Sequence, residues 1–196
     1  ALTSNTTGSS NTALGLNSLN LNITGNDNVA VGQQALEDNT ANANTAVGYA
    51  AMYQNTSGTS NVGLGYLALS QNTTANLNTA VGHSALKVNT TGANNVAIGG
   101  STLDANTTAS NNTAVGAYAL TDNTTGSENT AVGREALQAN TTSSSGTAVG
   151  YQAGYNTNGV GGVTAVGTQA LYSNTTGWNT AVGYQTLFAN TTGGDN

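Results

Sequence analysis

Residues 179–193 read N-T-A-V-G-Y-Q-T-L-F-A-N-T-T-G, and this stretch decides the fold because the whole chain repeats it. A glycine that follows a valine, leucine or isoleucine returns every 17 residues, with two intervals of 16. These glycines are Gly15, Gly32, Gly48, Gly65, Gly82, Gly99, Gly116, Gly133, Gly150, Gly167 and Gly183. Eleven units in one register indicate a repeat architecture. Positions are numbered here from the asparagine of N-T-A-V-G, and the residues at one position of all units form a column.

The composition excludes several classes of protein. The chain has 196 residues, a net charge of −6, 5% charged residues, and neither proline nor cysteine. Lys87 and Arg134 are the two basic residues, so no surface can follow a phosphate backbone and nucleic-acid binding is not expected. No apolar run approaches the roughly 18 residues of a membrane helix, so no membrane insertion is expected. Without cysteine there is no disulfide framework and no zinc-thiolate site.

The period predicts an all-β fold. A 17-residue unit is too short for a pair of helices, which takes more than about 30 residues. Threonine and valine favour strands, whereas asparagine and glycine favour tight corners. We therefore expect a parallel β-solenoid with one repeat per coil and about 11 coils, in which residues 1–196 form a single array. Each coil is expected to hold one strand over N-T-A-V-G, a second over Y-Q-A-L, and a corner at N-T-T-G whose glycine or asparagine takes a positive φ. The chain begins and ends within a repeat, which suggests a segment of a longer fibre.

The alternation of side chains in the first strand predicts which columns are inside. Positions 2 and 4 share one face, and position 3 lies on the other. Position 4 is always aliphatic and position 9 is nearly always leucine, so these two columns are expected to fill the interior. Position 3 is alanine in all units but one, where it is Gly63. This small-residue strip is expected to face outward and to pack against another chain; the alternative is that alanine fits a tight monomeric coil.

Several units resemble a known pattern. Asn95-Val96-Ala97-Ile98-Gly99 and the equivalent residues 28–32 resemble the core of the head repeats in YadA-like trimeric autotransporter adhesins. The small residue three places after the glycine, as in Ala119, matches as well. Longer N-T-A-V-G-Y-Q-A-L arrays are similar to segments of phage tail fibres. The resemblance covers essentially the whole chain and implies a left-handed parallel β-roll, a homotrimer around one axis, and a fibrous adhesin in place of an enzyme.

The candidate contact residues are aromatic. His83 shares a column with the rings of two preceding coils, and a second column carries three rings near a corner tryptophan. The weak surface-contact candidates are Tyr49, Tyr66, His83, Tyr155, Tyr172, Phe188 and Trp178. Both sets are expected to stack as ladders on the outside of the solenoid, whether they bind a receptor or only pack. No catalytic, cofactor-binding or metal-ligating set is found, because the eight acidic residues are scattered over variable positions.

Two functions follow from this reading. The first is a structural or adhesive fibre module, the shaft or head of a phage tail fibre or bacterial surface adhesin. It would be extracellular, on a virion or a bacterial cell surface, with itself and a host-cell receptor or glycan as partners. The second is an ice-binding β-solenoid that orders water on regular ranks of threonine and asparagine. A flexible loop or local bend is expected at residues 154–163, where the corner sequence is irregular.

Overall fold

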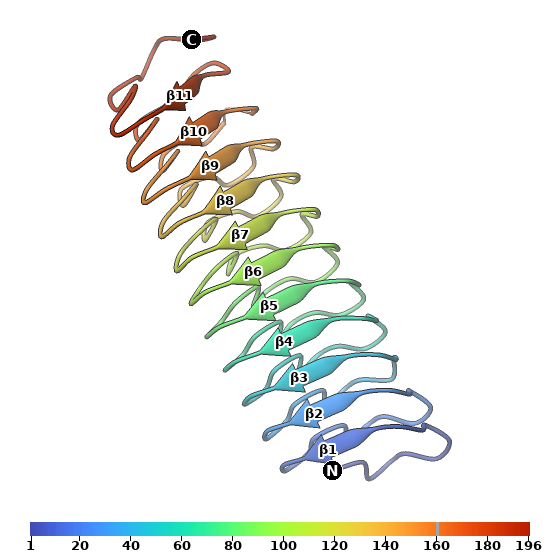
Figure 1. Cartoon of the computed structure of the whole chain (residues 1–196). Helices are drawn as coiled ribbons and strands as arrows, with labels where there is room; N and C mark the ends of the chain where they lie inside the picture. The colour runs from blue at the N-terminus through green and yellow to red at the C-terminus, as the bar shows by residue number, and fades with distance from the viewer. Residues whose placement is uncertain (160) are drawn as a thin grey trace.

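The computed structural model describes residues 1–159 and 161–196. In this part of the chain the secondary structure is eleven short strands in one parallel sheet, with no helix. Successive strands are hydrogen-bonded neighbours in sequence order, so the chain climbs one coil at a time and its termini lie at opposite ends of the long axis (Figure 1). The strands are β1 (Thr12–Leu14), β2 (Val29–Val31), β3 (Thr45–Val47), β4 (Val62–Leu64), β5 (Thr79–Val81), β6 (Val96–Ile98), β7 (Thr113–Val115), β8 (Thr130–Val132), β9 (Thr147–Val149), β10 (Thr164–Val166) and β11 (Thr180–Val182). The predicted parallel β-solenoid, with about 17 residues per turn, is confirmed.

The strand at positions 2 to 4 is the only one in each described coil, so the second strand expected over Y-Q-A-L is wrong. That segment is a series of turns, because residues 7 and 9 of the unit take a positive φ, 61° at Tyr118 and 51° at Leu120 in one coil. Tyr118 donates its N–H to the carbonyl oxygen of Gly100 in the coil before, and Leu120 donates to that of Ala136 in the coil after, both at 3.0 Å. These bonds between coils satisfy a backbone that is not extended.

The corner also differs from the prediction in one detail. Position 17 takes the positive φ, as at Asn111 and Glu128, whereas the corner glycine Gly126 does not. The prediction holds for the corner glycine Gly177, whose φ is +70°. A Cβ on Gly126 would collide with the carbonyl oxygen of Ser143 in the next coil. The corner needs a small residue there because the coils approach closely.

The interior is lined by alanine and leucine. The third, eighth and ninth columns are buried, as Ala114, Ala119 and Leu120 show with no exposed surface. The prediction for the ninth column is confirmed, but that for the fourth is wrong, because Val115 and its equivalents face outward. The expectation that the alanine strip faces outward is also wrong, because Ala114 and its equivalents are buried within their own chain.

The width of the coil explains why the alanine column faces inward and the valine column outward. The turn segment lies directly opposite the strand, and its leucines leave room only for a methyl group. Gly63, the one glycine of the third column, shows the tolerance, since a Cβ there would lie 2.9 Å from Cγ of Met52. Met52 is the residue that stands where most coils have leucine, so the longer side chain is matched by a smaller one. Alanine therefore fits a tight coil, as the alternative reading of the sequence held.

Two buried asparagines close each regular corner. Asn95 at position 1 and Asn106 at position 12 both donate from Nδ2 to the carbonyl oxygen of Ala109, at 2.9 and 3.1 Å. The twelfth column also bonds along the solenoid, with Asn106 donating to Asn89 at 2.9 Å and Asn123 donating to Asn106 at 3.1 Å. The twelfth column therefore forms an amide ladder along the solenoid. These asparagines are fully buried.

Candidate contact surfaces

The outward face of the sheet is formed by the second and fourth columns and is called the strand face below. Its fourth column is aliphatic in every coil and partly exposed, 40% at Ile98, 36% at Val132 and 38% at Val149. The second column, threonine or valine, is half-buried beside it, as at Thr113. Because the strand register is unbroken from β1 to β11, these side chains form one stripe along the whole solenoid. The surface available to another chain is this face and not the alanine column.

The first predicted aromatic ladder is confirmed as a stack at position 6, directly after the glycine bend. The ring centroids of Tyr49 and Tyr66 are 5.3 Å apart with planes 14° from parallel. Those of Tyr66 and His83 are 5.1 Å apart at 13°. The rings therefore face along the solenoid axis and show their edges to the solvent. A role for them in contacts stays a prediction.

The second predicted ladder, at position 10, is confirmed as well. Tyr155 and Tyr172 stack at 5.0 Å, and Tyr172 and Phe188 stack at 5.0 Å with planes 8° apart. Burial raises the pKa of the Tyr155 hydroxyl, and the neighbouring Tyr172 adds to the effect. Trp178 does not belong to this stack: it is 72% exposed on its corner, and its ring lies over Gly162 of the preceding coil. Its contact role also stays a prediction.

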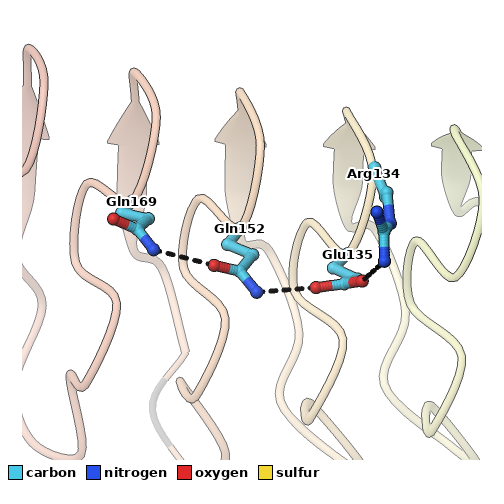
Figure 2. A network of polar contacts seen from close by, with 4 residues as sticks. All are labelled: Arg134, Glu135, Gln152 and Gln169. Carbon is cyan, nitrogen blue, oxygen red and sulfur yellow. Dashed lines mark hydrogen bonds and ion pairs between the residues drawn. The ribbon is translucent and has the colours of Figure 1, made fainter.

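A polar network runs along position 7 in the C-terminal half (Figure 2). The side chains of Gln152 and Gln169 reach toward one another from successive coils, with Gln169 Nε2 donating to Gln152 Oε1 at 2.8 Å. Gln152 Nε2 donates in turn to Glu135 Oε2 at 2.6 Å, and Gln185 Nε2 donates to Gln169 Oε1 at 2.8 Å. The far end is the ion pair of Glu135 Oε1 with Arg134 Nη2, also 2.6 Å. The three amide bonds run in one direction, and they converge with the Arg134 ion pair on the carboxylate of Glu135.

Sequence reasoning missed this network, although a signal was present. Position 7 reads Glu135, Gln152, Gln169 and Gln185 in four successive coils, whereas elsewhere the column holds mostly small, apolar or aromatic residues. Long amides placed one strand spacing apart, about 4.8 Å, can reach each other's polar atoms. Reading each column for runs of one chemistry would have found it.

The charged residues form no reactive cluster. No group of three or more histidine, cysteine, aspartate or glutamate side chains that could hold a metal occurs in the described ranges. Lys87 and Asp104 occupy one column in adjacent coils and line a shallow depression with Asp122, but they make no ion pair within 4.0 Å. Burial raises the pKa of the Asp104 carboxyl, and Lys87 and His83 oppose that effect. Such an arrangement carries no evident chemistry.

Comparisons with protein-family models, with curated proteins and with solved structures give no match to this chain. Over residues 1–159 and 161–196 there is no helix long and apolar enough to cross a membrane. The fold and the columns of the repeat define a β-solenoid repeat protein.

Proposed function

We propose that this chain is a rigid structural and adhesive module, the shaft or head of a phage tail fibre or bacterial surface adhesin. It acts outside the cell, on a virion or bacterial surface, and has no catalytic activity. The resemblance of Asn95–Gly99 to the head repeats of trimeric adhesins supports this function, together with the implied left-handed roll. The stack of eleven hydrogen-bonded strands supplies stiffness over roughly 50 Å.

The observation that carries the proposal is the aliphatic stripe of the strand face. Ile98, Val132 and Val149 leave more than a third of their surface in water. The side chains at the same position of the other coils are exposed or half-buried, as Val115 is. A contiguous apolar surface of this length indicates a contact with another protein surface. Three copies around one axis, each turning its strand face inward, would bury the stripe along its full length.

Native mass measured by light scattering tests this arrangement. The chain is expected at three times its mass of 19.3 kDa. The triple variant Ile98→Lys, Val132→Lys and Val149→Lys places three charges on the strand face and is expected to be monomeric. A matched control, with lysine at the exposed corner threonines 108, 125 and 142, adds the same charge and is expected to remain trimeric. A folded native monomer, or a strand-face variant that stays trimeric, would refute the proposal.

A second function is favoured by one specific observation. Thr113 and Val115 both face outward from the same strand, and this pair recurs one strand spacing further along in β8, β9 and β10. A regular rank of hydroxyl and methyl groups is the kind of surface that ice-binding solenoids need. Thermal hysteresis of a purified monomer that disappears in the strand-face variant would support ice binding. A trimer buries the same face, so a trimer that shows no thermal hysteresis would exclude ice binding and favour the fibre module.

A further inference from the structure

The position-6 column shows how a ring sits on this solenoid. In the coils of Tyr49, Tyr66 and His83, neighbouring rings stack with centroids 5.3 and 5.1 Å apart and nearly parallel planes. A ring in this column therefore turns its two faces toward the coil before and the coil after. When the next coil carries no ring, one face stays open.

The same column reads Tyr151, Thr168 and Tyr184 in coils nine to eleven, so the middle ring is replaced by a short side chain. Two strand spacings separate the outer rings, about 10 Å. A ring inserted over Thr168 would lie about 5 Å from each neighbour, the spacing of the ladders that are present. The opposite face of Tyr151 is covered, because the Arg134 guanidinium lies 5.9 Å from the ring centroid. The two tyrosines are 42% and 73% exposed, so the gap opens to solvent.

The amide network forms one wall of this gap. Gln169 is the chain neighbour of Thr168, and its amide is held between Gln152 and Gln185 at 2.8 Å on either side (Figure 2 shows its bond to Gln152). The contact of Arg134 with Glu135 shows that side chains at positions 6 and 7 come within hydrogen-bond distance of each other. Each amide has two N–H groups and two lone pairs, and the network uses one of each on Gln152 and Gln169. The unused ones are donors and acceptors held in place beside the gap.

Two stacking faces flanked by fixed amides match one kind of ligand. A pyranose ring has C–H groups on its faces, which stack on tyrosine, and hydroxyl groups on its rim, which bond to amides. A chair is also thicker than a flat aromatic ring and fills the gap better. The carboxylate of Glu135 and the net charge of −6 disfavour an anionic ligand. We propose that the gap over Thr168, between the rings of Tyr151 and Tyr184, binds one pyranose ring of a neutral glycan. This inference rests on the proposed adhesive function and gives that function a ligand class.

Protein-detected NMR titration of the full chain tests the site, with cellohexaose, maltohexaose and chitohexaose as probes. At least one of these is expected to bind in the millimolar range and to shift the ring resonances of Tyr151 and Tyr184 more than those of Tyr49. The substitution Thr168→Tyr supplies the missing ring from the protein itself and is expected to weaken binding by at least about tenfold, the loss of two stacked faces. The column accepts tyrosine in four other coils, so the fold should be kept.

Two further variants separate the site from general effects. Ala117→Tyr adds a ring to the same column away from the gap and is expected to leave binding unchanged. Gln169→Met keeps the length of the side chain, removes the amide, and is expected to weaken binding several-fold. The inference is overturned if none of the three saccharides binds the native chain, or if Thr168→Tyr binds as well as the native protein. Native mass is measured on the same samples: a trimer that binds no saccharide refutes the glycan site alone, and a monomer refutes the fibre arrangement alone.

Discussion

Replacing Asn106 by alanine tests whether the buried amide ladder holds the corners together. Its Oδ1 accepts from Asn123, and its Nδ2 donates to Asn89 and to the carbonyl oxygen of Ala109. The carbonyl keeps a second donor, Asn95, after the substitution. The Asn89 oxygen and one N–H of Asn123 lose their partners in a site with no access to water. At about 1–3 kcal/mol for each orphaned group, the expected loss of stability is about 2–6 kcal/mol.

Urea unfolding followed by circular dichroism measures the loss, and amide hydrogen exchange locates it. In a stack of repeats one weak interface can open by itself, so faster exchange is expected first around residues 89–124. Asn156→Ala is the matched control, because that asparagine is exposed and is expected to cost less than about 0.5 kcal/mol. If Asn106→Ala costs no more than the control, the ladder does not stabilise the corners and the reasoning fails.

A charged variant at the same position gives a pH signature. Asn106→Asp buries a carboxylate against the Asn89 oxygen, so its folded-state pKa must rise above the unfolded value of about 3.9. The resulting penalty grows as pH rises above that value and is absent below it, where both states are protonated. The protonated acid can also donate to Asn89. Stability that fails to recover toward acidic pH would contradict this account.

Three other substitutions have expected outcomes. Thr157→Asn should stabilise the chain by about 1 kcal/mol in urea unfolding. Asn174 Nδ2 is buried without a partner among the described residues, and the oxygen of the new amide would accept a hydrogen bond from it. No gain in stability would mean that Asn174 Nδ2 is already hydrogen-bonded to water. Gly116→Ala should cost more than about 2 kcal/mol of stability, because φ is +129° and the new Cβ would lie 2.6 Å from a carbonyl group of the next coil. The control Gly100→Ala should change stability little, because its Cβ would meet no atom within 4 Å. Equal effects of the two substitutions would refute the steric argument. Asp104→Asn should raise the melting temperature at neutral pH and have no effect below about pH 3.8. The reason is that a raised folded-state pKa makes the charged Asp104 carboxylate destabilising, by no more than about 1 kcal/mol, whereas the protonated carboxyl is not. A lower melting temperature at neutral pH would exclude burial as the main cause of the shift.

The fold was predictable because its information is in the period. A register held over eleven units fixes the coil length, the parallel strand pairing and the position of each strand, and pairs such as Thr113 with Thr130 follow directly. The stacked ladders were predictable for the same reason, since residues 17 apart must be neighbours. The extent of the strand in each coil could not be predicted from the sequence. Positive φ at Tyr118 and Leu120 has no mark in residue type, because tertiary hydrogen bonds impose it against the intrinsic preference of both residues.

The inside and outside of the sheet were assigned the wrong way round for a physical reason. Alternation separates two sets of side chains but does not say which set is buried, and larger side chains are usually the buried ones. Here the turn segment carries the large residues, and the strand must carry the small ones. The pair of Met52 and Gly63 held this information, since each departs from its column and one is larger where the other is smaller.

The irregular ninth unit keeps its place in the sheet. Thr147 of β9 pairs with Thr164 of β10 in the common register, so the sheet does not break where a loop or bend was expected; Val160 lies outside the described residues. The polar closure of the corner is replaced by apolar contacts, with Val163 buried where other coils have asparagine. Gly154 replaces a core leucine, and Leu137 of the preceding coil fills the space, since a Cβ on Gly154 would meet its Cδ2 at 2.9 Å.

Specific recognition on a repeat protein requires a column to change. A uniform column presents the same group every 4.8 Å or so, which gives stiffness and a long contact but no single site. Position 6 departs from uniformity, with stacked rings at Tyr49 and Tyr66, a cation over a ring at Tyr151, and a gap at Thr168. The amide run at position 7 begins in the coil of Arg134 and continues beside that gap. Two neighbouring columns that change over the same four coils are the strongest reason to look for a ligand there, and the strand face, which does not change, is the surface suited to assembly.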